Sequence, residues 1–362
     1  MSRLWLAQVD LKSLRWVPFI AALWLCGCSS VGYYGQMAKG QAALLWQRTP
    51  ITQVIDDPST DPALRRRLEL ALRAREFASR QLGLPDNRSY RLFVKLDRPY
   101  VVWNVFAAPE FSLSPLTHCF PIAGCVAYRG YYHEEAAQKA AEPLKAKGWD
   151  TYVAGVPAYS TLGWFDDPLL SSMLRWDDDQ LIATIFHELA HQNLYVQDDT
   201  TFNESYANFV QQEGLRQWRA AQGLPPPDPL REQQYRQFVG LILDTRKQLE
   251  SLYAQPLAAE AIRQAKGKVF ETMRRDYAQL RDTQWRGDHR FDAWMAGPLN
   301  NAKLLPFGLY EQWVPAFAAL YAEHPGNWPA FYARVRALAA LPAADRQARL
   351  KALAERQAEQ ND

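Results

Sequence analysis

The sequence is short of cysteine, of net charge and of long apolar runs. Only four of its 362 residues are cysteine, so the chain can form at most two disulfides. It has 41 basic and 39 acidic residues, and a net charge of +2 gives no argument for nucleic acid as a partner. The apolar run at 16–26 is about half as long as a membrane-spanning helix requires. We also find no internal repeat and no low-complexity tract.

Residues 1–27 have the pattern of a secretory signal peptide, with basic residues before a short apolar run. The run closes on Leu25-x-Gly27-Cys28, which resembles the lipobox of bacterial lipoproteins. The resemblance implies a lipid on Cys28 and a membrane anchor in the cell envelope, facing the periplasm. Ser29 resembles the outer-membrane sorting pattern. The alternative is an uncleaved anchor, or an ordinary signal with a chance cysteine.

Two cysteines, Cys119 and Cys125, would remain in the mature chain. In an oxidising compartment they are expected to close a small loop as a disulfide. The alternative is a pair of buried free thiols.

The patterning predicts an α+β fold. We divide the chain after the signal into a lipid tether with a short helix (28–50), a core with a small sheet (51–222) and a helical C-terminal region (223–362). The expected helices are 34–46, 62–82, 134–147, 230–254, 257–284, 310–322 and 329–338, and a polar tail helix after 343. Residues 230–284 read as a long helical hairpin. The expected strands are 90–96 and 101–107, paired as a hairpin, and 152–156.

The segment 181–191 contains His-Glu-x-x-His, formed by His187, Glu188 and His191. On a helix, residues four apart lie one turn above each other, so the two imidazoles can share a metal ion. The apolar residues of 182–189 fall on one side, and the histidines are expected to face a cleft. This pattern arises by chance in roughly one chain in a hundred of this length. The alternative is a helix surface without metal.

A catalytic zinc usually has a third protein ligand. Glu204 follows a turn-rich break, and Asn203 before it suits a helix N-cap. A helix beginning there could fold back and direct Glu204 at the metal, with the small Ala207 allowing close approach. Asn208, one turn later, could accept a hydrogen bond from a ligand imidazole. The alternative for Glu204 is a carboxylate that only stabilises the helix start.

These residues predict metal-assisted hydrolysis with one zinc ion per chain. Zinc acidifies a water and polarises a carbonyl, and Glu188 would be the general base. Ligand types alone leave manganese and cobalt open.

His187, Glu188, His191 and Glu204 together resemble the glutamate-zincin clan of metallopeptidases, which includes thermolysin. Further stretches are similar to a family of bacterial lipoproteins called predicted aminopeptidases. These stretches are 119–125, 128–131, 158–168 and 299–302. The resemblance implies a zincin-like core followed by a mostly helical half.

The resemblance also implies further parts of the site. Strand 152–159 would bind the substrate backbone by strand addition, and the loop 160–168 would border the cleft. The alternative for that loop is a structural turn with buried aromatic residues. Tyr310 would donate to the oxyanion, with His289 and His324 as the next candidates.

We therefore expect a zinc aminopeptidase acting on periplasmic peptides. Such an enzyme must bind a free α-ammonium, and the candidate carboxylates are Glu110, Asp166 and Asp167. The first alternative is a zinc endopeptidase acting on envelope proteins. The second is a non-catalytic lipoprotein that serves as a binding or assembly module.

Overall fold

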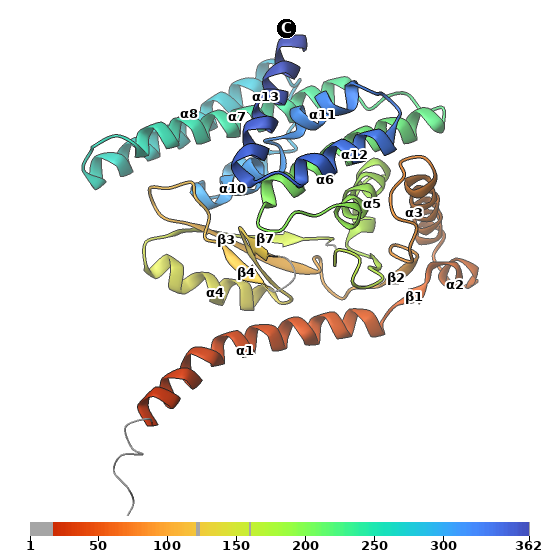
Figure 1. Ribbon diagram of the computed structural model, residues 1–362, viewed down its shortest axis with the longest axis horizontal. Coiled ribbons are helices and arrows are strands. Elements are labelled where there is room, and N and C mark those ends of the chain that lie inside the picture. The colour runs from red at the N-terminus through yellow and green to blue at the C-terminus, as the bar shows by residue number, and fades with distance from the viewer. Residues whose placement is uncertain (1–16, 121–123, 159–160, 362) are drawn as a thin grey trace, which may run out of the picture. The chain divides into compact units, whose positions relative to one another are not determined.

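The computed structural model describes residues 17–120, 124–158 and 161–361 (Figure 1). The chain divides into two units, Met1–Gln47 and Arg48–Asp362. Helix α1 (Val17–Trp46) belongs to the first unit. The predicted helix 34–46 is therefore the end of a longer one, because nothing in the preceding apolar run stops a helix. Cys28 lies within α1, and its side chain lies outside the described residues.

Among the described residues, no helix combines the length and the apolar character that crossing a membrane requires.

The second unit is α+β, with helices around small sheets. Its elements are β1 (Thr49–Pro50), α2 (Ile51–Asp56), α3 (Pro62–Arg80), β2 (Leu92–Val94), β3 (Val102–Ala108), β4 (His118–Phe120), β5 (Gly124–Val126), β6 (Arg129–Tyr131), α4 (Glu134–Ala146), β7 (Asp150–Val156), β8 (Leu169–Leu170), α5 (Asp178–Asn193), α6 (Thr200–Ala221), α7 (Pro229–Tyr253), α8 (Ala259–Thr283), α9 (Asp292–Ala296), α10 (Asn301–Tyr310), α11 (Val314–Ala322), α12 (Trp328–Ala339) and α13 (Ala343–Asn361). The boundary drawn at 222/223 lies between α6 and α7, inside this unit.

Local signals placed several helices correctly. Asp61 caps α3 by accepting from the backbone nitrogens of the first turn, and Gly83 adopts φ +65° just beyond its end. Gly148 does the same after α4, at φ +76°. Only a glycine adopts this left-handed conformation without strain, so both helices end where the sequence predicts.

The predicted hairpin of 90–96 with 101–107 is wrong. β2 pairs instead with β1 and β8, whereas β3 lies in a separate sheet of order β6-β3-β7. All seven residues of β3 are buried, and both of its edges are occupied, antiparallel to β6 and β7. Because β3 is buried on both faces, pairing along both of its edges stabilises it more than pairing with β2 alone would.

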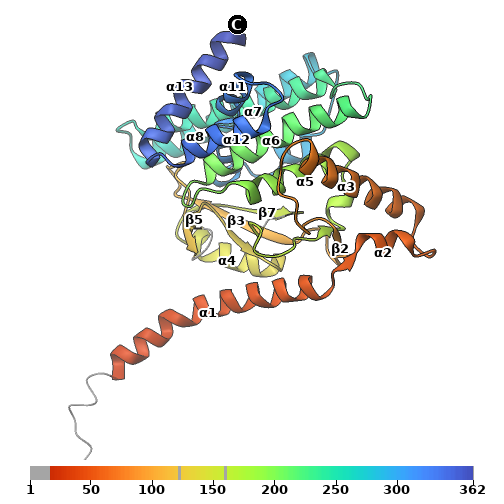
Figure 2. The ribbon, with the colours of Figure 1, turned by 45° about the vertical axis from the view of Figure 1, so that its right-hand side comes forward.

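Two helices pack on this three-stranded sheet. Helix α4 packs against β3 and β7, and α10 contacts the same two strands (Figures 1 and 2). Phe106 and Ala108 of β3 form a cluster with Ala302 and Leu305 of α10. The alternate residues of β3 are free to face α4, since successive strand residues point to opposite faces.

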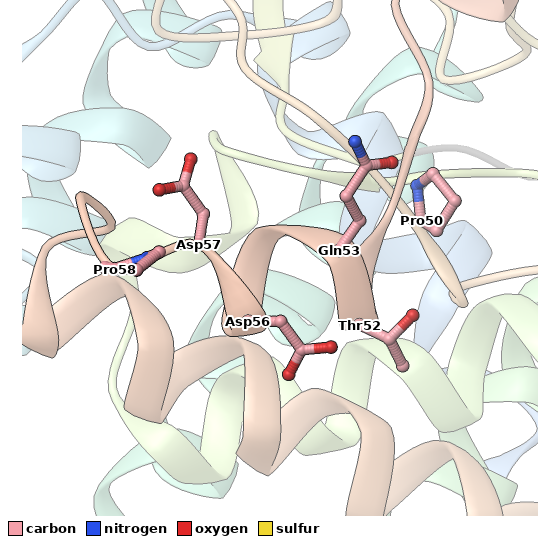
Figure 3. Close-up of a pocket in the computed structure, with 6 residues that line it drawn as sticks. All are labelled: Pro50, Thr52, Gln53, Asp56, Asp57 and Pro58. Atoms are coloured by element: carbon pink, nitrogen blue, oxygen red, sulfur yellow. The ribbon is translucent and has the colours of Figure 1, made fainter.

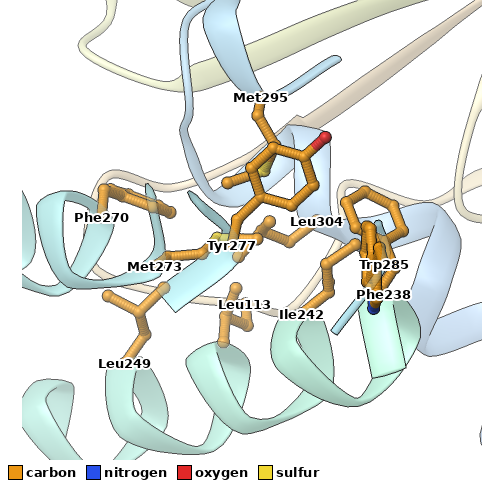
Figure 4. Packing of buried hydrophobic residues seen from close by; sticks show 10 residues of the cluster. All are labelled: Leu113, Phe238, Ile242, Leu249, Phe270, Met273, Tyr277, Trp285, Met295 and Leu304. Carbon is orange, nitrogen blue, oxygen red and sulfur yellow. The ribbon is translucent and has the colours of Figure 1, made fainter. Parts of the chain in front are cut away.

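Helices α7 and α8 pack against each other, as the periodicity of 230–284 predicts. Their contact is filled by an aromatic and aliphatic cluster that also receives residues from α9 and α10 (Figure 4). The predicted helix 310–322 is wrong at its start. Tyr310 ends α10, and the next helix begins at Val314, because Glu311 caps α10 and Pro315 fits the first turn of α11.

Cys119 of β4 and Cys125 of β5 lie opposite each other in an antiparallel pair and are joined by a disulfide. Asp198, in the loop between α5 and α6, accepts a hydrogen bond from the backbone nitrogen of Cys125 at 2.5 Å. The hairpin is thereby tied to the connection between those two helices.

We expect replacement of both cysteines by serine to lower the free energy of unfolding by about 2 kcal/mol, since the crosslink closes a short loop. Urea denaturation would measure the loss. A reductant should lower the stability of the natural protein to that of the variant and leave the variant unchanged. A reductant without effect on the natural protein would contradict the prediction.

Candidate metal centre

Helix α5 carries His-Glu-x-x-His through the interior. Asp177 caps it by accepting from the backbone nitrogen of Gln180 at 2.8 Å. Every residue from Leu181 to His191 is buried. Helices α3 and α6 both pack on α5, and His187, Glu188 and His191 each keep 8% exposure. That the histidine side of this helix faces a cleft stays a prediction.

Helix α6 begins four residues earlier than predicted. Asp199, not Asn203, is its N-cap and accepts from the backbone nitrogen of Phe202 at 3.0 Å. Asp199 also forms an ion pair with the nearly buried Arg346 of α13 at 2.8 Å. This ion pair favours Asp199 over Asn203 as the N-cap. Asn203 lies inside the helix and binds both backbone polar groups of Val196. It fixes the loop that joins the two helices.

Close approach of α6 to its neighbours depends on small residues. Ala207 is fully buried, as predicted for the contact with α5. Farther along, Gly214 leaves no space for a side chain, because an added Cβ would lie 2.8 Å from Leu82 and 2.9 Å from Phe186 of α5. The two helices therefore lie close enough for Glu204 to reach the histidines.

Three side-chain atoms converge between α5 and α6. His187 Nε2 lies 3.2 Å from His191 Nε2 and 3.3 Å from Glu204 Oε2. His191 Nε2 lies 3.5 Å from the same oxygen. All three residues are buried, and they are the group of the described residues that could hold a metal ion.

These distances fit zinc. Ligand atoms at about 2.0–2.1 Å from a tetrahedral ion lie about 3.3 Å from one another. The triangle of 3.2, 3.3 and 3.5 Å has this size. In addition, Oε2 of Glu204 is buried and lacks a hydrogen-bond donor among the described residues. Buried polar atoms rarely stay unsatisfied, so the donor set suits a cation at the centre of the three atoms.

The surroundings of Glu204 and Glu188 shift the pKa values of these two carboxyls in opposite directions. Burial alone would raise the pKa of Glu204, but the facing imidazoles of His191 and His187 more than offset this and lower it to about 2. Burial raises the pKa of Glu188 to about 8, opposed in part by His187. Burial thus disfavours the charged form of Glu188, whereas the two imidazoles favour the charged form of Glu204.

A tyrosine that the sequence analysis did not single out lies beside the group. The ring of Tyr195 is 6.4 Å from that of His191. Burial, together with the charges of Glu204 and Asp198, raises its pKa to about 12. Its hydroxyl therefore stays protonated and is a possible donor. Its position four residues after His191, just past the helix end, was the available signal.

The three carboxylates predicted for an α-ammonium site are engaged elsewhere. Glu110 forms an ion pair with Arg263 of α8 at 2.6 Å. The carboxylate of Asp166 lies 3.6 Å from Arg88. Asp167 is buried and accepts hydrogen bonds from Thr161 and Gln192.

Asp167 ties the loop 161–168 to α5, because it accepts a hydrogen bond from Gln192, which directly follows His191. That the loop 160–168 borders a substrate cleft stays a prediction. Trp164 and Phe165 at its tip are 66% and 47% exposed, so the alternative of a turn with buried aromatic residues is wrong. Of the predicted strand 152–159, the part to Val156 forms β7, and Tyr159 lies outside the described residues.

The three candidates for the oxyanion donor differ in what the structure shows of their side chains. The side chain of Tyr310 lies outside the described residues, although its backbone ends α10. His289 is bound to Asp292 at 2.7 Å, and His324 contacts Arg334 at 2.9 Å. Both histidines have partners outside the metal-ligand group.

Asn208 does lie one turn beyond Glu204, but its amide nitrogen donates to Glu311 at 2.6 Å. That its carbonyl oxygen accepts from a ligand imidazole stays a prediction. Glu311 was missed, because the expected helix 310–322 placed it in an ordinary first turn.

A separate hollow lies over α2 (Figure 3). Its lining comprises Pro50, Thr52, Gln53, Asp56, Asp57 and Pro58. None of these residues comes from α5 or α6, so the hollow is unrelated to the metal-ligand group.

With the geometry established, comparison with known proteins identifies the family. A protein family described as "Putative aminopeptidase" matches residues 32–350. The chain belongs to this family. No curated protein and no solved structure matches the sequence. The match spans the metal-ligand group, the sheets and most of the helical region, and so covers the second unit up to residue 350.

Proposed function

We propose that this protein is a zinc-dependent aminopeptidase with a zincin-like core. The observation that carries the proposal is the convergence of His187, His191 and Glu204 with zinc-ligand spacing, beside the buried Glu188. The family membership supports peptidase chemistry. When bound, zinc would supply a Lewis acid that acidifies water and polarises a peptide carbonyl.

The chain's own residues would perform the proton transfers. Glu188 precedes His191 by three residues on α5, so its carboxylate lies at the edge of the helix face that carries the two histidines. It would take a proton from the attacking water and return it to the leaving amine. Glu204 keeps its charge and holds the two imidazoles in place. The hydroxyl of Tyr310 or Tyr195 would donate to the oxyanion.

The edge of β7 suits the substrate backbone. This strand pairs with β3 on one side, and all seven of its residues are partly exposed. In the described residues no strand covers its other edge. An extended peptide would add there through main-chain hydrogen bonds.

We further propose that the protein is lipidated on Cys28 and faces the periplasm, with peptides as substrates. The support is the sequence pattern of residues 1–28. The endopeptidase and the non-catalytic module remain the competing functions.

Turnover of matched peptides tests the proposal. We expect about one zinc per chain, cleavage of a peptide with a free amino terminus, and little cleavage of its N-acetylated form. A chelator should abolish turnover, and added zinc should restore it. Equal cleavage of the blocked peptide would favour the endopeptidase. Bound zinc without turnover would favour the non-catalytic module, and absence of metal would refute the proposal.

A further inference from the structure

Glu311 is a carboxylate held firmly by two helices distant from it in sequence. It caps the C-terminal end of α10. The amide nitrogen of Asn208 in α6 donates to its Oε1 at 2.6 Å, and the hydroxyl of Tyr235 in α7 donates to the same oxygen at 2.8 Å. Two donors on one oxygen fix both the position and the orientation of the carboxylate.

This carboxylate lies one helical turn from the metal ligands. Asn208 follows Glu204 by four residues on α6, so both side chains project from the same face. The backbone nitrogen of Trp313 donates to Ser205 at 3.1 Å, which fastens the chain after Glu311 onto the same turn of α6. His187 is close enough for its charge to lower the pKa of Glu311, against the larger raising effect of burial.

Glu311 is nevertheless not one of the converging metal ligands. The group found among the described residues consists of His187, His191 and Glu204. Both donors to Glu311 use Oε1, and no described residue donates to Oε2. Glu311 itself is partly exposed. No lysine or arginine of the described residues forms an ion pair with Glu311.

A fixed carboxylate with one open oxygen and no cation of its own suits a cationic ligand. We propose that Oε2 of Glu311 binds the α-ammonium of the peptide substrate. The inference rests on the proposed peptidase function and explains why that function would be restricted to the amino terminus. An ammonium offers three donors, and its bond to a carboxylate is charge-assisted.

The spacing along α6 is compatible with binding of the first residue. One turn of α6 rises about 5.4 Å, and one extended residue spans about 3.5 Å. With its ammonium at Glu311, a peptide would present its first carbonyl near the group of His187, His191 and Glu204.

The test uses the full chain with Glu311→Gln. The glutamine oxygen can still accept from Asn208 and Tyr235, so the substitution removes charge while keeping shape. For a free peptide we expect kcat/KM to fall about 10- to 100-fold, the effect of one hydrogen bond to a charged group, mainly through KM. The N-acetylated peptide should be unaffected. Glu271→Gln, an exposed position on α8, is the matched control and should change neither.

A binding measurement separates this inference from the proposed function. Calorimetry would compare Leu-Gly-Gly and its N-acetyl form on zinc-loaded Glu188→Gln, with and without Glu311→Gln. We expect a preference for the free peptide that disappears when Glu311 is replaced, even if the natural protein turns over no peptide. Unchanged zinc content would show that the site is intact, and Tyr235→Phe, which keeps the charge, should weaken free-peptide binding only a few-fold.

Three results would overturn the inference. Equal losses for free and acetylated peptides would assign Glu311 a structural role. An unchanged preference would show that the ammonium binds elsewhere. A second zinc ion that disappears in Glu311→Gln would make the residue a metal ligand.

Discussion

Glu188→Gln is expected to lower kcat by about a thousandfold, the effect of losing a general base, while leaving the zinc content unchanged. Glutamine has the same shape as glutamate but cannot accept the proton. Because Glu188 is not part of the converging ligand group, its replacement should not disturb metal binding. Peptide hydrolysis at saturating substrate and metal analysis of the same preparation would measure both effects.

Glu271→Gln on the exposed face of α8 is again the matched control and should retain full activity. Loss of zinc in Glu188→Gln would mean that the residue is a ligand. Retained turnover would mean that another group is the base, and the assignment of Glu188 would then fail.

Glu204→Gln is expected to abolish stabilisation by zinc. A ligand present at about 1,000 times its dissociation constant stabilises the folded state by about 4 kcal/mol, which corresponds to a rise of about 6 °C in the melting midpoint of a domain of this size. The natural protein should show this rise. The variant loses the anion that converges with both imidazoles, so its midpoint should hardly respond.

The comparison is made within each variant, with and without zinc, so a change in the stability of the metal-free form does not affect it. Glu188→Gln should keep the full rise. An equal rise in Glu204→Gln would show that the metal binds elsewhere.

The convergence of His187, His191 and Glu204 was predictable because its information is local. Two histidines four apart on one helix, and an acidic residue soon after a turn, indicate a metal site by their spacing. The details of the helix starts were not. Asp199 is chosen as N-cap partly through its pairing with Arg346, which lies 147 residues away. No local sequence pattern around Asn203 indicates that Asp199 contacts Arg346.

The strand pairing shows the same limit. Residues 90–107 have the texture of a hairpin, yet β2 and β3 belong to different sheets. β2 pairs with β1, earlier in the chain, and with β8, later in it, whereas both partners of β3 come later. Alternation of residue types does not encode which edges meet. Glu311 escaped notice for a related reason, since its importance depends on Asn208 and Tyr235 rather than on its neighbours.

The two halves of the site differ in contact order. The residues proposed to bind zinc lie on consecutive helices, α5 and α6, whereas Glu311 bonds to α6 from 103 residues beyond Asn208. Local contacts form sooner than distant ones, because less chain entropy is lost in closing them. During synthesis α5 and α6 also emerge before α10. The chain would therefore gain its ability to hold zinc before it gains the residue that selects the amino terminus, so selectivity would be the last property to mature.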